Sequence, residues 1–329
     1  MQFTITPFLF FYCCHTIKKT KIRSLYTISK DTTFFLIMDS VPHFSPFSLT
    51  CRGRNVTFHR PVVMGILNVT PDSFYDGGRY TTPDAIHAQA RQLLADGADI
   101  IDIGAVSSRP GAQLLSPDEE AARLVPIVRL LRKELPSDTI LSVDTCYSLP
   151  AAKAMEAGAD IINDISGGQL DPHMFSTVAS LQVPYILMHM RGTPATMQQP
   201  ENTRYTDIVD NLANYFAAKL SELDRLGVRE VCLDPGFGFA KTVEQNHQLL
   251  HRLPELMARF PQYPFLIALS NKSMITRKLP PHIPAGAFPD VPDSEWGTVA
   301  LNTVALMSGA SLLRVHTPRP TRVAIELLY

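Results

Sequence analysis

Short apolar runs alternate with longer amphipathic segments from residue 62 to the end of the chain. The runs are rich in Val, Ile and Leu, which is typical of strands buried on both faces of a parallel sheet. They lie at 62–67, 100–103, 140–143, 161–162, 185–188, 231–233, 265–269 and 312–315. The amphipathic segments predict helices at 83–95, 117–134, 149–157, 174–181, 205–226, 243–260, 295–308 and 322–328.

This alternation gives about eight strand–helix units, the number that a closed parallel barrel requires. We therefore predict an α/β fold, a (β/α)₈ TIM barrel. Gly97, Gly158, Gly227 and Gly309 follow predicted helices, where glycine takes the left-handed conformation that ends a helix. Apolar residues on either side of 52–55 predict a small hairpin that turns at Gly53 and plugs the barrel floor.

The segment before this hairpin, residues 1–48, is predicted to be an extension that is disordered or not part of the natural chain. Its apolar run at 8–14 is too short to span a membrane, which takes about 20 residues. The positive charges follow that run, which is the wrong order for a secretory signal. A transit peptide stays possible, but we favour an over-extended reading frame in which Met38 is the true start. Residues 49–329 form the predicted barrel domain.

Charge and cysteine content narrow the class of protein. The 30 Lys and Arg residues nearly balance 31 Asp and Glu residues, which argues against nucleic acid as a partner. No segment after the extension is apolar enough to cross a bilayer, so no membrane partner is expected. The five cysteines suit neither a zinc site nor a disulfide framework, and we expect free thiols in the cytoplasm.

Polar residues follow the predicted strands, at the end of the barrel where active sites are built. They are Asn68, Asp102, Asp144, Asn163, Asp164, His189, Arg191, Asp234, Lys241, Lys272, Arg314 and His316. We interpret Asp102 and Asp164 as helix caps or loop supports. His189 is either a core histidine or a site residue, and the sequence leaves both open.

Most of the remaining residues, together with Arg109 from the loop after 100–103, fall into two chemical groups. Asp144, Asn163, Asp234 and Lys272 supply the acceptors, amide and cation that suit the edge of a flat heterocycle. Asn68, Arg109, Arg314 and His316 suit a polyanion, with a metal ion able to share Asn68. The ligand should therefore carry a heterocycle at one end and phosphates at the other. The chain has no phosphate-binding glycine loop or dinucleotide fingerprint, so a nucleotide is not indicated.

The strand-end motifs resemble those of the dihydropteroate synthases, the pterin-binding folate enzymes that sulfonamides inhibit. The similar segments are MGILNVTPDSF at 64–74, SRPGA at 108–112, SVDT at 142–145, INDISGG at 162–168, MHMRGTP at 188–194, DPGFGFAK at 234–241, KS at 272–273 and RVH at 314–316. They run in the family order from about residue 49 to the C-terminus, and together they are highly specific.

The resemblance implies a transferase that joins 6-hydroxymethyl-7,8-dihydropterin diphosphate to para-aminobenzoate, giving 7,8-dihydropteroate and diphosphate in tetrahydrofolate biosynthesis. It implies that Asp144, Asn163, Asp234 and Lys272 hold the pterin. Asn68, Arg109, Arg314 and His316 would hold the diphosphate with Mg²⁺, and Asn68 would be the metal ligand. Ser108, Pro110, Phe239, Lys272 and Ser273 would hold para-aminobenzoate, with Ser273 at a helix N-terminus. Loops 69–79 and 106–114 would close over the substrates, and the family suggests a homodimer.

Some positions depart from the common family pattern. Ala105-Val106 stands where Gly-Glu is usual, and Ser108 replaces a Thr whose hydroxyl it keeps. Asn271 replaces an Arg near the aminobenzoate carboxylate, and Thr317 replaces an Asp after His316. The change at Asn271 is expected to alter affinity for para-aminobenzoate and for sulfonamides.

Two alternative functions remain at this point. A pterin-dependent methyltransferase shares the barrel, but it would need no cations for a diphosphate, and 171–176 lacks the glycine of a cobalamin motif. A non-catalytic pterin-binding relative would be expected to lose metal or cation positions, whereas Asn68 and Arg109 remain. Both alternatives are therefore less favoured.

Overall fold

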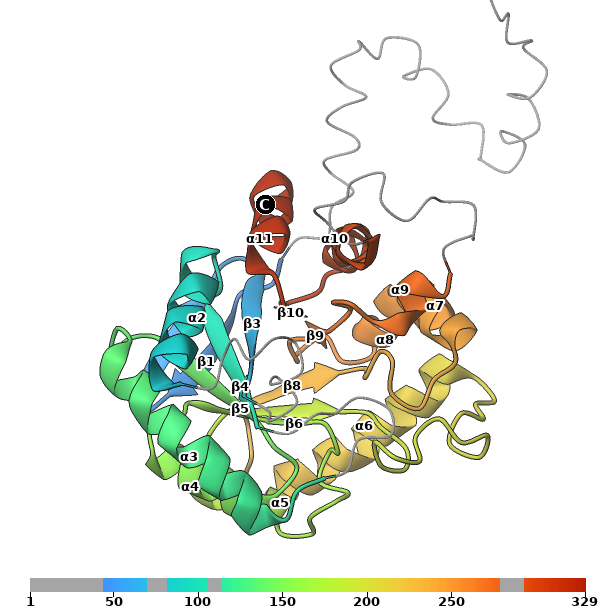
Figure 1. The fold of residues 1–329 in the computed structure, drawn as a ribbon. Helices are drawn as coiled ribbons and strands as arrows, with labels where there is room; N and C mark the ends of the chain where they lie inside the picture. The colour runs from blue at the N-terminus through green and yellow to red at the C-terminus, as the bar shows by residue number, and fades with distance from the viewer. Residues whose placement is uncertain (1–43, 70–81, 106–113, 279–292) are drawn as a thin grey trace, which may run out of the picture. The chain divides into compact units, whose positions relative to one another are not determined.

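The chain is described by a computed structural model that covers residues 44–69, 82–105, 114–278 and 293–329 (Figure 1). The strands are β1 (Phe47–Cys51), β2 (Arg54–Phe58), β3 (Val62–Asn68), β4 (Ile100–Gly104), β5 (Ile140–Asp144), β6 (Ile161–Asp164), β7 (Tyr185–Met188), β8 (Val231–Asp234), β9 (Leu266–Ile267) and β10 (Leu312–Val315). The helices are α2 (Pro83–Ala95), α3 (Pro117–Glu134), α4 (Ser148–Glu156), α5 (Met174–Leu181), α6 (Ile208–Arg225), α7 (Val243–His251), α8 (Leu253–Ala258), α9 (Ser273–Thr276), α10 (Asp293–Met307) and α11 (Pro318–Leu328). Most of the predicted extension and of the two predicted closing loops lies outside the described residues.

The main sheet has eight parallel strands in the order β8-β7-β6-β5-β4-β3-β10-β9. Leu233 in β8 also forms a parallel bridge with Phe265, which stands directly before β9, and this bridge joins the two edges of the sheet. The helices lie around the outside of the strands (Figure 1). The predicted (β/α)₈ barrel is therefore confirmed.

Helix bounds follow capping and proline positions. The bounds of α2, α3 and α5 are those predicted. The helix predicted from 205 begins later, at Ile208, because the Asp207 side chain accepts a hydrogen bond from the Asp210 N–H and caps α6. The helix predicted over 243–260 is divided at Arg252, since Pro254 has no N–H to continue the helical ladder. Over the described part of the chain, no helix combines the length and the apolar character that crossing a membrane demands.

The β1–β2 hairpin closes the amino end of the barrel, as predicted. Cys51 pairs with Arg54, and the two turn residues, Arg52 and Gly53, have φ of 48° and 74°, which is the type I′ geometry that suits hairpins. Leu49 and Cys51 are buried in an apolar cluster with the first residues of barrel strands. Those first residues are Val62, Ile100, Ile140, Ile161, Leu266 and Leu312.

The predicted glycine turns lie at the same end. Gly97 and Gly158 have φ of 95° and 111°, in the left-handed region. A Cβ at Gly97 would lie 2.9 Å from Arg322 Cγ, and one at Gly158 would lie 2.8 Å from Arg132 Cγ. Each arginine donates hydrogen bonds to the carbonyl of the glycine it covers. The floor is therefore a structural region with closely packed turns, and the predicted site lies at the opposite end.

Candidate active site

The carboxyl ends of neighbouring strands place polar residues in one row. Asn68 pairs with Gly104, Gly104 with Asp144, and Asp144 with Asn163. Gly104 has no side chain, and a Cβ there would lie 3.7 Å from Asn68 Oδ1 and 3.7 Å from Asp144 Oδ2. The glycine therefore leaves this position of the row without a side chain, between an exposed amide and a carboxylate.

Asp102 is the centre of a buried hydrogen-bond network in this row. Its carboxylate accepts hydrogen bonds from Ser142 Oγ at 2.6 Å, Asn163 Nδ2 at 3.0 Å and Arg314 Nε at 2.6 Å. The interpretation of Asp102 as a cap or loop support was wrong, because β4 continues to Gly104 and directs this side chain to its strand neighbours. The sequence contained one signal, since Asp102 interrupts an otherwise apolar strand, Ile-Ile-Asp-Ile.

Arg314 links the two predicted chemical groups. Its Nε contacts Asp102, and its Nη2 donates to Asp144 Oδ2 at 2.8 Å. The structure therefore places Arg314 beside the heterocycle group, although the sequence assigned it to the polyanion group. Burial raises the pKa of Asp144 to about 7, and the nearby Arg314 guanidinium opposes that rise. The contact with Arg314 therefore offsets only part of the cost of burying this carboxylate.

Lys272, Asp234 and Phe239 form a second contact group. The Lys272 ammonium lies 4.3 Å from the centre of the Phe239 ring, a cation–π distance. Burial lowers the pKa of Lys272 to about 8, while the Asp234 and Asp144 carboxylates oppose that change. Burial also raises the pKa of Asp234, against the effect of the Gly236 N–H and of nearby Lys272 and Arg314. These mutual electrostatic effects place Asp234, Lys272, Arg314 and Asp144 in one charged cluster.

His316 and Ser273 lie on the neighbouring part of the rim, after β10 and β9. His316 Nδ1 is 2.9 Å from Ser270 Oγ, and the His316 backbone N–H donates to the same hydroxyl. Ser273 is the first residue of the short helix α9, as predicted. Sequence reasoning did not identify Ser270 as a support for His316. Ser108, Arg109 and Pro110 lie outside the described residues, so their predicted roles stay predictions.

Asp164 and His189 are buried supports of the loops above the barrel. Asp164 accepts from the Ser166 and Gly168 N–H groups and from the Tyr185 hydroxyl, which confirms it as a loop support. The His189 ring is 1% exposed and lies 3.1 Å from Lys241 Nζ. The sequence left His189 as either a core histidine or a site residue, and the structure supports the core histidine.

The donor set is compatible with magnesium held mainly by a phosphate substrate. Mg²⁺ prefers oxygen ligands and usually keeps several waters, with few protein ligands and the rest from substrate phosphates. Asn68 offers an exposed amide oxygen next to Asp144. Within the described ranges no group of three or more His, Cys, Asp or Glu side chains could hold a metal ion by itself. A metal at Asn68 would therefore need oxygens from the substrate.

Comparison with known proteins identifies the family. The sequence model of the pterin-binding enzymes matches residues 64–316. The chain belongs to the pterin-binding enzyme family. It is 44% identical over 260 residues to a dihydropteroate synthase of Synechocystis sp., covering 78% of this chain and 85% of that protein. It also spans about half the length of plant folate synthesis bifunctional proteins, such as 55% of one from Arabidopsis thaliana.

Solved structures of pterin-binding enzymes agree with this assignment. The chain is similar to the Yersinia pestis dihydropteroate synthase in a sulfonamide drug complex, with a TM-score of 0.75 and 37% identity over 86% of this chain and 98% of that one. It is also similar to the Xanthomonas albilineans dihydropteroate synthase with 4-aminobenzoic acid, with a TM-score of 0.74 and 36% identity over 86% and 97% of the two chains. The resemblance first seen in the strand-end motifs is thus confirmed.

Proposed function

We propose that this pterin-binding enzyme is a dihydropteroate synthase that acts in folate biosynthesis. It joins 6-hydroxymethyl-7,8-dihydropterin diphosphate to para-aminobenzoate and releases diphosphate. The observation that carries this proposal is the buried polar cluster of Asp102, Asp144, Asn163, Asp234 and Arg314 at the carboxyl end of the barrel. Buried charges are costly, and nothing in barrel packing requires so many at one end.

The pterin edge meets Asp144, Asn163, Asp234 and Lys272 in this proposal. The carboxylates accept from the amino and ring N–H groups of the heterocycle, while the Lys272 ammonium and the Asn163 amide donate to its acceptors. Asp102 holds the Asn163 amide and the Arg314 guanidinium by direct hydrogen bonds, so it fixes two residues that contact the ligand. Because these partners are arranged before binding, little rotamer entropy is lost when the pterin enters.

Asn68, Arg109, Arg314 and His316 would hold the diphosphate, and Asn68 would also bind Mg²⁺. The Arg314 Nη1 group and the His316 ring donate to phosphate oxygens, while Asp102 and Asp144 keep the guanidinium in place. Magnesium, when bound, supplies positive charge to the leaving diphosphate. Para-aminobenzoate would be held by Ser108, Pro110, Phe239, Lys272 and Ser273. Of these residues, Lys272 and Phe239 lie against each other and offer a flat surface.

The reaction follows a dissociative course without a covalent enzyme intermediate. The described thiols are poor nucleophiles, because burial raises the pKa of Cys146 and of Cys232 and keeps them protonated. Diphosphate therefore leaves first, and its charge is stabilised by the cations around it. The electron-rich pterin spreads the positive charge left on its methylene carbon, and the positioned aryl amine then attacks that carbon.

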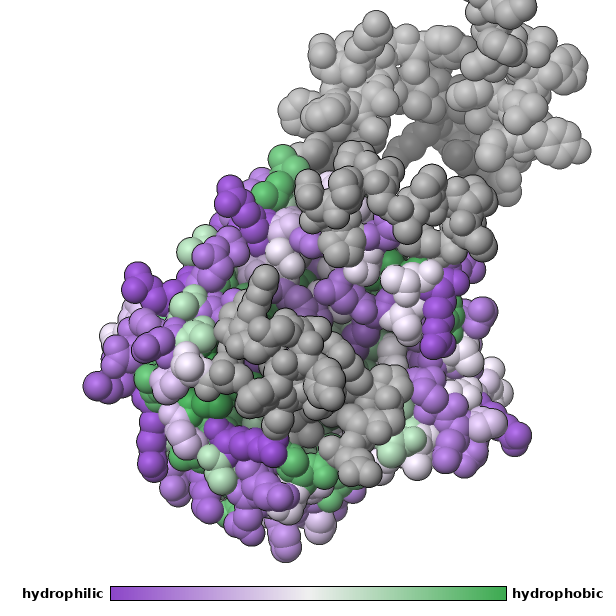
Figure 2. Space-filling model, viewed as in Figure 1, coloured by the Kyte–Doolittle hydropathy of each residue, from purple (hydrophilic) through white to green (hydrophobic). Residues whose placement is uncertain are grey.

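The proposed assembly is a homodimer in the cytoplasm. Large apolar side chains are exposed on α10 and α11, and they are Trp296, Val304, Met307, Val323 and Leu327. Hydrophobic residues are visible at the end of α11 in Figure 2, where much of the remaining coloured face is hydrophilic. Such residues on two adjacent helices suit a contact with a second copy. Light scattering of the purified chain tests the dimer.

The deciding experiment measures dihydropteroate formation from the two substrates with Mg²⁺ present and after chelation. We expect turnover with the metal and a large loss without it. Release of diphosphate without dihydropteroate would contradict the proposal. Methyl transfer from a methylated pterin, with no use of the diphosphate substrate, would favour the methyltransferase alternative.

A further inference from the structure

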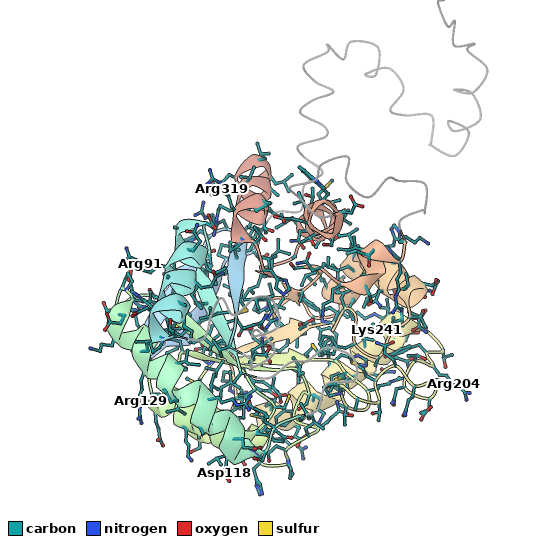
Figure 3. All side chains as sticks on the ribbon, viewed as in Figure 1. Arg91, Asp118, Arg129, Arg204, Lys241 and Arg319 are labelled. Atoms are coloured by element: carbon teal, nitrogen blue, oxygen red, sulfur yellow. The ribbon has the colours of Figure 1, made fainter. Side chains whose placement is uncertain are left out.

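Lys241 is a buried lysine that the proposed mechanism leaves without a role. Burial lowers its pKa to about 7, and the nearby Asp234 carboxylate opposes that change. Its side chain is enclosed, with the residue 2% exposed, and it stands at the end of the loop that begins with Asp234. In Figure 3, Lys241 lies closer to the centre of the barrel than Arg91, Arg129 and Arg319 do. Placing an ammonium there costs free energy unless each of its donors finds a partner.

The three donors of the Lys241 ammonium each have an acceptor. Nζ lies 2.9 Å from the Gly236 carbonyl oxygen, 3.1 Å from the Phe239 carbonyl oxygen and 3.1 Å from His189 Nδ1. Burial, together with the nearby positive charge of Lys241, lowers the pKa of His189 well below its usual value. The ring is therefore neutral, and in this arrangement Nδ1 accepts while the other ring nitrogen carries the proton.

His189 is itself held firmly next to the loop. Its ring packs edge-to-face on Tyr215, with centroids 4.8 Å apart. Its backbone N–H donates to the Asp234 carbonyl at 2.9 Å, and a Cβ at Gly236 would lie only 2.1 Å from the His189 carbonyl oxygen. The histidine thus presents a fixed acceptor to Lys241.

The loop that Lys241 contacts has an unusual backbone. Gly236, Gly238 and Ala240 have φ of 69°, 81° and 49°, so the left-handed conformation recurs at every second residue. For Ala240 this conformation is strained, and it persists only where neighbours enforce it. Tyr205 donates to the Ala240 carbonyl, Gln198 to the Gly238 carbonyl and the Phe239 N–H to the Gly236 carbonyl, while Asn246 accepts from the Gly238 N–H. Among the described side chains, Lys241 is the one that bonds to both carbonyls at 236 and 239.

The same loop sets three parts of the candidate site. The Gly236 N–H donates to Asp234 Oδ1 at 2.7 Å and orients that carboxylate. Gly238 leaves room for the Lys272 stem, because a Cβ there would lie 3.0 Å from Lys272 Cδ. Phe239 places its ring beneath the Lys272 ammonium. A change in the loop would therefore move the carboxylate and the lysine together.

We propose that Lys241, seated on His189, is a positioning residue that holds loop 234–240 in the shape that aligns Asp234 and Lys272 for the pterin. This inference rests on the proposed function, since it gives the loop a pterin to align. The ammonium stabilises the loop through hydrogen bonds to its carbonyl groups. In this proposal neither Lys241 nor His189 contacts the substrate. Removing the ammonium takes one donor from each of these two carbonyls, although the Phe239 N–H still donates to Gly236, so the strained backbone is held less firmly.

The test compares Lys241→Met with Lys219→Met in the full chain. Lys219 is a matched control on α6, where its ammonium lies over the Phe175 ring at 5.0 Å, away from the site. We expect Lys241→Met to raise the KM and the Kd of the pterin diphosphate at least about ten-fold, because small displacements of positioning groups have large effects. The KM of para-aminobenzoate, measured at saturating pterin, should rise by a smaller factor, because Phe239 and Lys272 also line its pocket whereas Asp234 contacts only the pterin. The control should leave both constants unchanged.

A second variant keeps the proposal open to contradiction. His189→Phe preserves the ring but removes the acceptor, so it should weaken pterin binding less than Lys241→Met does. The double variant should be no worse than Lys241→Met alone, because the two residues act through one contact. If Lys241→Met fails to fold, a selective loss of pterin affinity in His189→Phe would support the proposed role of Lys241.

The outcomes separate this inference from the proposed function. If the wild-type chain neither binds the pterin diphosphate nor forms dihydropteroate, that result would contradict the proposed function itself. A wild-type chain that does both, with folded variants that bind the pterin equally well or lose both substrates in parallel, would overturn only the role of Lys241. Additive effects of the two substitutions would show that His189 and Lys241 act separately, which also contradicts the proposal.

Discussion

The two ends of the barrel differ in chemistry, although the same strands form both: the amino end is apolar, and the carboxyl end is polar and charged. At the amino end, the first residues of the strands are apolar and pack against Leu49 and Cys51 of the hairpin. At the carboxyl end, the same strands carry Asp102, Asp144, Asn163 and Asp234, with Arg314 and Lys272 between them. One end therefore stabilises the fold, whereas the other keeps charges buried where a ligand can meet them.

Ion pairs show the same contrast. At the floor, Asp160 accepts from Arg132 and Arg52 and also from the Leu141 N–H, so it ties turns together around a filled core. At the rim, Asp102 and Asp144 share Arg314, yet burial still raises the pKa of Asp144 to about 7. Burial therefore disfavours the charged form of the Asp144 carboxyl, and a bound ligand that donates hydrogen bonds would stabilise that form. Perturbed pKa values of this kind are common at functional sites. Four changes test this division.

The largest effect is expected for Asp234→Ala at the rim. The substitution removes a buried acceptor for the pterin, and turnover should fall about 10³-fold or more, as when a site loses a required hydrogen bond. The melting temperature should change little, because a carboxyl whose pKa burial raises contributes little stability in its charged form. Asp234→Asn is the matched control for shape. Unchanged turnover in the alanine variant would remove Asp234 from the site.

A change of similar severity, but in stability, is expected for Leu49→Ala at the floor. Leu49 is 5% exposed and fills the plug, so its truncation should lower the free energy of unfolding by about 2–4 kcal/mol. The KM values of the folded variant should stay the same, since the site lies at the other end. Ser48→Ala, an exposed neighbour on the same strand, should cost less than about 0.5 kcal/mol. An altered KM in the Leu49→Ala variant would contradict the view that the two ends of the barrel act independently.

A smaller effect concerns pH. Asp144 must be ionised to hold Arg314, so kcat/KM for the pterin substrate should rise as the pH increases through about 7. Lys272 must be protonated to donate, so the same constant should fall as the pH rises through about 8. The two limbs are properties of the coupled cluster, and each should change activity about ten-fold per pH unit.

The control for this profile is Lys272→Arg. A guanidinium keeps its proton throughout the range, so the falling limb should move to higher pH or disappear. A profile of the wild-type chain that is flat from pH 6 to 9 would contradict the electrostatic description of the rim.

The smallest effect is expected for Asn271→Arg, which restores the common family residue. A partly exposed cation near the aminobenzoate carboxylate should contribute about 1 kcal/mol or less, so the KM of para-aminobenzoate should fall by roughly a few-fold. The KM of the pterin substrate should stay the same. Asn271 has φ of 55°, a conformation that asparagine tolerates better than arginine, so the variant should also lose up to about 1 kcal/mol of stability. A shift in the pterin KM, or no shift at all, would show that Asn271 does not face the aminobenzoate.

Local patterns in the sequence determined the framework of this protein. The alternation of apolar runs and amphipathic segments predicted all eight barrel strands, because strand and helix periods depend on neighbouring residues alone. It also predicted the floor hairpin, since its turn lies between apolar residues a few positions apart. The polar residues at strand ends followed from the same logic, because parallel strands bring their carboxyl ends to one rim.

Only the tertiary structure decided which of those polar residues work together. Asp102 takes its hydrogen bonds from residues 40, 61 and 212 positions away, and its place within an apolar run does not reveal these partners. Arg314 forms hydrogen bonds with the carboxylates of Asp102 and Asp144, which belong to other strands of the barrel. In the same way, His189 contacts Lys241, which lies 52 positions away in the sequence. Side-chain pairing inside a barrel depends on strand register and on burial, and both exist only once the sheet has closed.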